Sequence, residues 1–292
     1  ISPCLVGSEM CIRDRARIVH TVDAVSPDDT ASQAVRRGKA TSMWMAIASV
    51  AAGETDAVVS AGNTGALMAM SKLQLRPMTG VTRPAIAAFF PTVGELVCML
   101  DLGANIECDA ENLVQFAILG QAFHRSLTGK ESPRLGLLNV GEEEQKGHDY
   151  LRVASRRLSD PELGVKYHGF VEGSDITNGQ LDVVVTDGFS GNVALKMAEG
   201  ISSMFTRLLR RSLNKSFLSR LGYLLARSAL SEMRTHIDPR HYNGAVFLGL
   251  NGIAVKSHGG TDRIGFGNAI NVALELVDHG FLPDVSAAIA RA

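Results

Sequence analysis

The chain has 292 residues, of which 46% are hydrophobic and 20% charged, and its formal net charge at pH 7 is −1. This composition is typical of a globular protein with a sizeable core, and the near-zero charge gives no support for a nucleic-acid partner. No apolar run approaches the roughly 20 residues that cross a bilayer as a helix. The four cysteines form no C-x-x-C pair, which argues against a zinc ribbon or thioredoxin-type site and favours a reducing, cytoplasmic setting.

Residues 1–15, ISPCLVGSEMCIRDR, show no helical or strand period and hold two of the four cysteines. We interpret them as a non-native or disordered leader and leave them out of the fold prediction. Residues 16–292 are predicted to form one domain.

The first predicted strand–loop–helix unit lies at residues 56–68, DAVVSAGNTGALM. An apolar run meets two glycines and an asparagine, and a helical pattern follows. Glycines at this junction suit a tight turn, or they let backbone N–H groups approach an anion at a helix N-terminus. One loop alone does not separate these two interpretations.

Four further units repeat this pattern, at residues 96–120, 134–158, 182–196 and 245–277. Each begins with a short apolar run typical of a buried parallel strand and continues through glycine and polar residues into helical spacing. The alternation predicts an α/β fold with a parallel sheet covered by helices on both faces. We expect the Gly/Asn loops to share the C-terminal edge of that sheet, which favours a ligand site over turn chemistry alone. The nucleotide-binding motifs G-x-G-x-x-G after a strand and G-x-x-x-x-G-K-[ST] are absent.

The polar residues that follow the strands favour an anion as the ligand. Lys146 stands in GEEEQKG, Lys196 lies one helical turn after Asn192, and Lys256 and His258 stand in KSHGG. A single lysine of this kind is typically a solvated surface residue, but the repeated placement favours binding of a phosphate or a developing oxyanion. The acidic run 142–144 either is a solvated charge run or orients Lys146.

Other candidate groups have simpler interpretations. Ser190 in GFSG has no base in its local sequence, so we interpret it as a turn or phosphate-binding residue rather than a nucleophile. Asp101 and Asp187 end strands and are more typical of caps than of metal ligands. We therefore predict no metal and no cofactor.

Residues 200–231 contain six basic residues and no acidic ones. Two apolar helical faces, separated by residues 214–216, predict a protruding amphipathic hairpin at about 200–232. Its apolar stripe either packs on the core or across a dimer, or it contacts a membrane surface or an acidic partner. For the second alternative the contact residues are Arg207, Arg210, Arg211, Phe217, Arg220, Leu221 and Leu224.

Seven motifs together resemble the bacterial phosphate acyltransferase (PlsX) family, from about residue 18 almost to the C-terminus. They are, in chain order, SAGNTGALM, RPAIA, LDLGAN, LLNVGEEEQKG, TDGFSGNVALK, YNGAVFLGLNG and VKSHG. The resemblance implies acyl transfer from acyl-[acyl carrier protein] to inorganic phosphate, which gives acyl phosphate for phospholipid synthesis. It also implies a Rossmann-like three-layer α/β/α fold with a mostly parallel sheet, related to isocitrate dehydrogenases and phosphotransacetylases.

The resemblance further implies a cytoplasmic homodimer attached peripherally to an anionic membrane surface. Its partners would be acyl carrier protein, phosphate and a membrane glycerol-3-phosphate acyltransferase, and no cofactor is implied. Family members begin with a strand and a DAMGGD-like loop that this sequence lacks. We therefore expect the first βα units to be missing and a sheet edge to be exposed.

On this resemblance, phosphate is the nucleophile and no covalent enzyme intermediate is needed. The residues expected to be catalytic are Asn63, Lys146, Asn192, Lys196, Lys256 and His258. The residues expected to bind phosphate or substrate are Ser60, Gly62, Thr64, Gly65, Asp101, Asn105, Asp187, Ser190 and Gly191. Lysines, amides and backbone N–H groups would hold the phosphate and the tetrahedral oxyanion, and His258 would steady the phosphate or protonate the leaving thiolate.

Three rival functions stay open from the sequence. A phosphotransacetylase that uses acyl-CoA shares the loop chemistry, and a comparison of acyl donors separates it. A metal- and NAD-dependent decarboxylating dehydrogenase should carry an acidic metal cluster and substrate-clamping arginines, which the sequence does not show. A non-enzymatic lipid-binding scaffold would use the hairpin alone.

Overall fold

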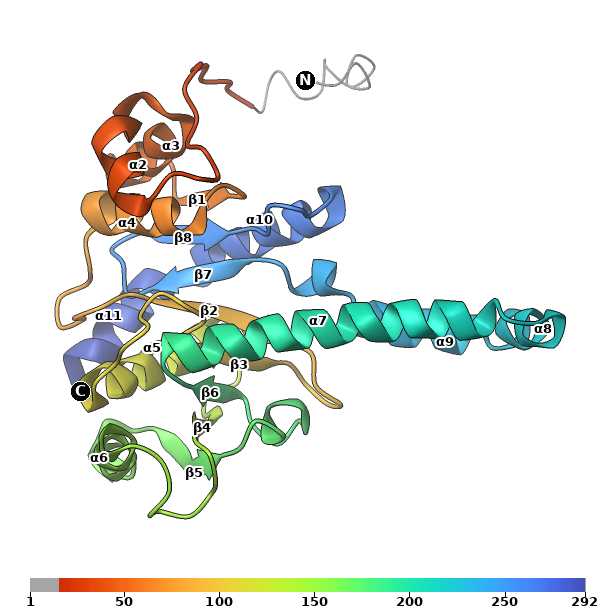
Figure 1. Cartoon of the computed structure of the whole chain (residues 1–292). Helices are drawn as coiled ribbons and strands as arrows, with labels where there is room; N and C mark the ends of the chain where they lie inside the picture. The colour runs from red at the N-terminus through yellow and green to blue at the C-terminus, as the bar shows by residue number, and fades with distance from the viewer. Residues whose placement is uncertain (1–15, 292) are drawn as a thin grey trace.

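The computed structural model describes residues 16–291, so the predicted leader lies outside the described residues. An 8-stranded sheet lies between two layers of helices (Figure 1), with the strand order β1-β8-β7-β2-β3-β6-β4-β5. The strands are β1 (Ala57–Ser60), β2 (Ala85–Phe90), β3 (Val97–Leu100), β4 (Arg134–Leu138), β5 (Lys166–Val171), β6 (Val183–Val185), β7 (Ala245–Leu248) and β8 (Ile253–Lys256).

The sheet is mostly parallel, as predicted, but it runs in two directions. The pairs β1–β8, β3–β6, β4–β6 and β4–β5 are parallel, whereas β2–β3, β2–β7 and β7–β8 are antiparallel. The strands β1, β8 and β2 therefore run opposite to the other five. The prediction that all Gly/Asn loops share one edge is wrong, because the loops after β1 and β8 lie at the opposite end from those after β3, β6 and β4.

Short connections cause this reversal. Residues 249–252 join β7 to β8 in a tight turn, in which Gly249 has a φ of 85°. Residues 91–96 join β2 to β3 without a helix. Connections this short can only join antiparallel strands, because a parallel pair needs a crossover of a dozen residues or more.

The helices form two layers with separate cores. One face of the sheet is covered by α2 (Ala31–Arg37), α3 (Ser42–Ala51), α4 (Thr64–Leu75) and the start of α7 (Gly188–Leu213). The other face is covered by α5 (Ala110–Thr128), α6 (Asp149–Leu158), α10 (Arg263–Asp278) and α11 (Phe281–Arg291). Single-turn helices are η2 (Gly38–Ala40), η3 (Pro161–Leu163), η4 (Asp175–Thr177) and η5 (Pro239–Tyr242). Side chains of β2 alternate between the cores, with Ile86 and Phe90 on the α4 side and Ala85 and Ala87 on the α5 side.

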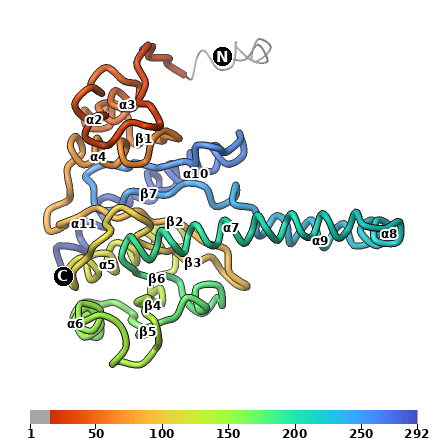
Figure 2. The backbone as a smooth tube through the Cα atoms, viewed as in Figure 1, coloured from red at the N-terminus to blue at the C-terminus, as the bar shows by residue number. Residues whose placement is uncertain are grey.

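A helical hairpin projects far from this body (Figures 1 and 2). α7 runs outward, α8 (Phe217–Leu225) forms the tip, and α9 (Arg227–His236) returns. At the base, the ring Nε2 of His236 lies 2.6 Å from the carbonyl oxygen of Thr92, so the returning helix is tied to the β2–β3 turn. At the tip, Phe217 and Leu225 are 80% and 81% exposed. Within residues 16–291, no helix combines the length and apolar character needed to cross a bilayer.

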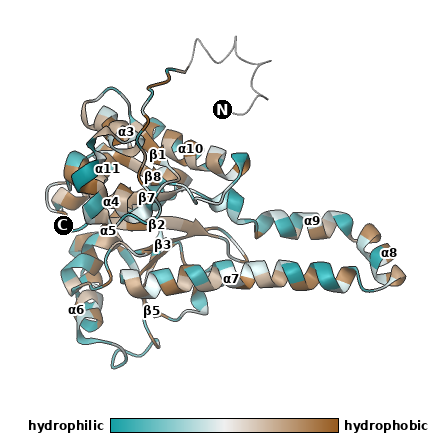
Figure 3. Ribbon diagram, turned by 45° about the horizontal axis from the view of Figure 1, so that its top comes forward, coloured by the Kyte–Doolittle hydropathy of each residue, from teal (hydrophilic) through white to brown (hydrophobic). Residues whose placement is uncertain are grey.

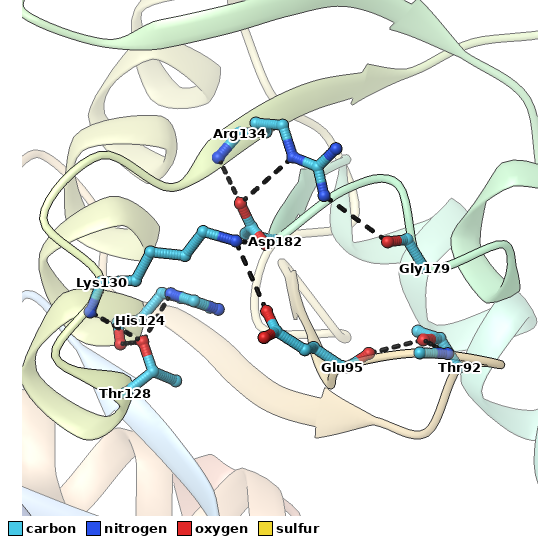
Figure 4. Close-up of polar contacts among 9 residues, drawn as sticks. Thr92, Glu95, His124, Thr128, Lys130, Arg134, Gly179 and Asp182 are labelled. Atoms are coloured by element: carbon cyan, nitrogen blue, oxygen red, sulfur yellow. Dashed lines mark hydrogen bonds and ion pairs between the residues drawn. The ribbon is translucent and has the colours of Figure 1, made fainter.

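A buried carboxylate just before β6 links this strand to the start of β4 and to the loop after α5 (Figure 4). The side chain of Asp182, only 2% exposed, accepts hydrogen bonds from the Lys130 ammonium at 2.7 Å and from the Arg134 backbone N–H at 2.6 Å. Lys130 also lies 3.4 Å from the exposed carboxylate of Glu95. Burial raises the pKa of Asp182, but the hydrogen bonds from Lys130 and Arg134 outweigh burial, and the net pKa is lowered.

Asp182→Asn is expected to lower the free energy of unfolding at neutral pH by about 1–3 kcal/mol, because it weakens buried charge-assisted hydrogen bonds. Since the folded-state pKa of Asp182 is lowered, its stabilisation is present above the unfolded value of about 3.9 and is lost as the pH falls through the folded value. Urea midpoints at neutral and acidic pH measure both effects, and the gap between wild type and variant should close in acid. Glu95→Gln removes only the exposed ion-pair partner of Lys130, so it should lower the free energy of unfolding by about 0.5 kcal/mol or less.

Candidate functional site

A large cavity of about 1140 Å³ lies between α4 and α7, above β2. Its apolar floor comes from β2, where Ile86, Ala88 and Phe90 point to the same face. The cavity runs from the loop after β3 to the loop after β8, because β2 lies between these two ends of the sheet. Residues expected from the sequence that line it are Thr64, Gly65, Asn192, Lys196, Arg207, Lys256 and His258.

One end of the cavity is cationic. Lys196 on α7 and Lys256 at the end of β8 line it together, and Lys196 forms an ion pair with Glu199 at 2.8 Å. Burial and the nearby Lys196 charge lower the pKa of Lys256. His258 Nδ1 accepts a hydrogen bond from the Gly260 backbone N–H at 3.1 Å, which leaves Nε2 for another partner. This end can therefore bind an anion through two ammonium groups and an imidazole.

The N-terminus of α4 completes the cationic end. Asn63 caps this helix by accepting a hydrogen bond from the Ala66 N–H at 3.0 Å, and its amide donates to the carbonyls of Pro27 and Asp29 at 3.0 and 2.9 Å. The Asn63 side chain is thus committed to holding the loop. The backbone N–H groups of Thr64 and Gly65 have no acceptor within the described part of the chain. Free N–H groups at a helix N-terminus are suited to an anion.

Asn192 lines the cavity one helical turn before Lys196 on α7, next to Gly103 of the loop after β3. A Cβ built on Gly103 would lie 3.4 Å from the Asn192 Cβ, so loop and helix are in close contact there. The Asn192 amide makes no hydrogen bond within residues 16–291 and is exposed to the cavity. It is therefore available to a substrate.

Asp101 and Asn105 do not line the cavity, but they fix the loop that lies next to Asn192. The Asp101 carboxylate accepts hydrogen bonds from the backbone N–H groups of Ile86 at 2.9 Å and Asn105 at 2.7 Å, and from the Asn105 side-chain amide at 2.9 Å. Burial raises the pKa of Asp101, and these donors oppose the rise. Asp101 therefore fixes the 101–105 loop.

Three further predicted residues, Asp187, Ser190 and Gly191, position α7, and the structure adds Tyr150 to them. Asp187 caps the helix, accepting hydrogen bonds from the Ser190 N–H at 2.8 Å and the Ser190 hydroxyl at 3.0 Å. Gly191 lets the first turn of α7 touch β3, because a Cβ there would lie 1.9 Å from the Asp101 carbonyl oxygen. Tyr150, whose pKa burial raises to about 12, donates to Asp187 at 3.4 Å. These residues hold Asn192 and Lys196 in place.

The remaining predicted residues lie off the cavity. Lys146 is exposed and forms an ion pair with Glu143 at 2.7 Å, and this hydrogen bond raises the pKa of Lys146. Within the run 142–144, Glu143 is thus the residue that orients Lys146. Ser60 accepts a hydrogen bond from the Gly62 N–H at 3.2 Å and shapes the loop before α4.

Sequence reasoning missed Asn243, which orders the cationic end. Its amide donates to the Ser257 hydroxyl and the Gly265 carbonyl, both at 2.7 Å, and its oxygen accepts from the His258 N–H at 2.9 Å. The available signal was its position in YNGAVF, directly before an apolar strand. Between residues 16 and 291, no group of three or more His, Cys, Asp or Glu side chains is placed to hold a metal ion.

Solved structures with the same fold come from phosphotransacetylases. A phosphotransacetylase from Streptococcus pyogenes matches with a TM-score of 0.55 at 17% identity, over 87% of this chain and 77% of that one. A branched-chain phosphotransacylase from Enterococcus faecalis V583 matches with a TM-score of 0.54 at 13% identity, over 94% of this chain and 96% of that one. The chain therefore has a phosphotransacetylase-like fold.

Sequence comparison then identifies the family. The family described as "Fatty acid synthesis protein" matches residues 1–283. A phosphate acyltransferase from Rhodospirillum centenum is 56% identical over 272 residues, 93% of this chain and 77% of that protein. A phosphate acyltransferase from Rhodospirillum rubrum is 51% identical over 287 residues, 98% of this chain and 82% of that protein. The chain belongs to the phosphate acyltransferase family, which confirms the resemblance seen in its motifs.

Proposed function

We propose that the chain transfers a fatty acyl group from acyl-[acyl carrier protein] to inorganic phosphate and so forms acyl phosphate for phospholipid synthesis. The observation that carries this proposal is one cavity that joins a cationic end to an apolar floor. An acyl phosphate has the matching parts, a charged head and an apolar chain. Membership of the phosphate acyltransferase family supports the same reaction.

In this mechanism phosphate binds at the cationic end. Lys196, Lys256 and the free N–H groups at the start of α4 neutralise its charge and hold one oxygen toward the thioester carbonyl. The new C–O bond forms as the carbonyl becomes an oxyanion, which the free Asn192 amide stabilises one helical turn from Lys196. The C–S bond then breaks, the Nε2–H of His258 donates a hydrogen bond to the leaving thiolate, and the thiolate takes up the proton that hydrogen phosphate loses as it becomes the acyl phosphate.

The reaction as proposed needs no acyl-enzyme intermediate. Ser190 does not line the cavity, and its hydroxyl donates to the cap residue Asp187 at 3.0 Å. Phosphate itself is the nucleophile, so the protein contributes positioning and preorganised donors. The acyl chain would lie over Ile86, Ala88 and Phe90 on the cavity floor.

The decisive assay is phosphate-dependent release of free thiol from palmitoyl-acyl carrier protein, with palmitoyl-CoA run in parallel and circular dichroism on the same sample. Release that requires phosphate and prefers the carrier protein supports the proposal. Preference for the CoA thioester would instead favour a phosphotransacetylase-like donor. A folded chain that never consumes phosphate but binds vesicles would favour the lipid-binding scaffold.

We also propose that the hairpin tip docks on an anionic membrane surface, where a homodimer hands its product to a membrane glycerol-3-phosphate acyltransferase. Exposed apolar side chains at the tip, such as Phe217 and Leu224, support insertion, and Arg211 and Arg220 suit anionic headgroups or the acidic carrier protein.

Leu221→Glu is expected to reduce binding to anionic liposomes about tenfold or more, because it places a charge on the apolar face of the tip. Leu274→Glu is a matched control, since Leu274 on α10 is 54% exposed and Leu221 is 46% exposed. Liposome flotation at low and high salt measures both variants. Binding that ignores salt and survives Leu221→Glu would contradict docking through the tip.

A further inference from the structure

The outgoing arm α7 and the returning arm α9 of the hairpin extend together from the body of the protein (Figure 3). Residues of both arms line a second cavity of about 340 Å³. Phe205, Leu209 and Leu213 of α7 line it from one side, and Leu230 and Met233 of α9 line it from the other. We call this cavity the hairpin slot. It is a partly apolar space between two helices that extend away from the body of the protein.

The hairpin slot has a strongly cationic lining. Four arginines contribute to it, Arg210 on α7, Arg220 on α8, and Arg227 and Arg234 on α9, and no acidic residue does. Within residues 16–291, none of these four guanidinium groups forms an ion pair with a carboxylate. Unpaired guanidinium groups beside apolar side chains are complementary to an amphiphile with an anionic head.

The hairpin slot adjoins the large cavity. Thr206 and Ile237 line both spaces, at the base of the two arms. Arg207, the next residue on α7, also lines the large cavity. The two cavities therefore share part of their walls at the base of the hairpin.

We propose that the hairpin slot binds a single-chain acyl phosphate, the product of the proposed reaction, as it leaves the large cavity. This inference rests on the proposed function. The acyl chain would lie between Leu209 and Leu230, and the phosphate would contact the arginines. The volume of the slot is near the lower end of the range for ligand pockets, about 300–1,000 Å³, which suits one chain better than a two-chain lipid.

The test uses decyl phosphate with a photoreactive diazirine at the chain end, which has no acyl bond to hydrolyse. The full chain is irradiated with this probe in the absence of lipid, and the labelled peptides are mapped by mass spectrometry. We expect labels on α7 and α9 at positions that face the slot. Leu209→Trp fills the slot and should lower this labelling about tenfold. Leu208→Trp should leave it unchanged, because Leu208 is 52% exposed and lines neither cavity.

A second variant tests the positive charge of the hairpin slot rather than its packing. Arg210→Gln, an exposed change, should weaken labelling about tenfold through loss of one charge-assisted hydrogen bond, whereas labelling by the uncharged decanol analogue should not respond. Labels confined to the tip around Phe217, or equal losses in Leu209→Trp and Leu208→Trp, would overturn the proposal.

The thiol-release assay on the same samples separates the proposed reaction from the proposed binding in the slot. Release without labels in the slot contradicts the slot alone, and labels in the slot without release contradict the proposed reaction.

Discussion

Lys256→Ala is expected to lower kcat/KM for phosphate-dependent thiol release by about 10²–10³-fold, the usual cost of losing one preorganised charge-stabilising donor. Lys256 lines the cavity at its cationic end and is half-buried. Its partner Lys196 is more exposed and shares its charge with Glu199. The loss should therefore be larger for Lys256→Ala than for Lys196→Ala. Steady-state kinetics with varied phosphate measure both variants.

Two further variants sharpen this test. Lys256→Arg keeps the charge at high pH, so it should recover part of the phosphate affinity that Lys256→Ala loses. Asn192→Ala should lower kcat with little change in the phosphate KM, because the amide is assigned to the oxyanion rather than to phosphate. If Lys146→Ala were as damaging as Lys256→Ala, the anion would lie at the loop after β4, and its placement at the cationic end would be wrong.

Local sequence patterns were sufficient to predict most strands of the sheet. The runs at 97–100, 134–138 and 183–185 are strongly apolar and lie in strands buried on both faces, and the run at 57–60 forms the half-buried edge strand β1. Strand β2 was missed although AIAAFF is equally apolar. No helical pattern follows it, so the rule that pairs each strand with a helix did not apply.

The two-way course of the sheet could not be predicted from the same rule. Residues 245–277 were interpreted as one strand followed by a helix, yet the turn at 249–252 divides them into two antiparallel strands. This turn places Lys256 and His258 at the end opposite to Asp101. The candidate site is consequently a groove along β2 rather than a cluster at one edge.

The roles of the candidate residues depend on contacts that the sequence does not contain. Asn63, Asp187 and Ser190 occur in glycine-rich loops as Asn192 does, and the sequence assigned all four to the site. In the structure the side chains of the first three make the hydrogen bonds that cap α4 and α7. The Asn192 amide has no partner among the described residues. Helix caps and substrate donors use the same residue types, so only the geometry separates them.

Gly191→Ala is expected to lower the stability of the chain by about 3 kcal/mol and to abolish thiol release. A Cβ at this position would lie 1.9 Å from the Asp101 carbonyl oxygen and 2.9 Å from the Thr186 Cγ2. Backbone and strand-end atoms cannot yield as the tip of a flexible side chain can, so the cost lies at the upper end of the overpacking range. Relief would require α7 to move away from β3, and this movement would displace Asn192 and Lys196. Urea midpoints and the thiol-release assay measure the two effects.

Gly200→Ala on the same helix is the matched control. Nothing lies within 4 Å of a Cβ built at Gly200, so the substitution should raise stability by about 0.5–1 kcal/mol through reduced backbone entropy of the unfolded chain. A destabilised Gly191→Ala beside a stabilised Gly200→Ala would show that close packing of α7 on β3 is required. If Gly191→Ala kept both its urea midpoint and its activity, α7 would not need that contact, and the role of Gly191 in positioning Asn192 would be refuted.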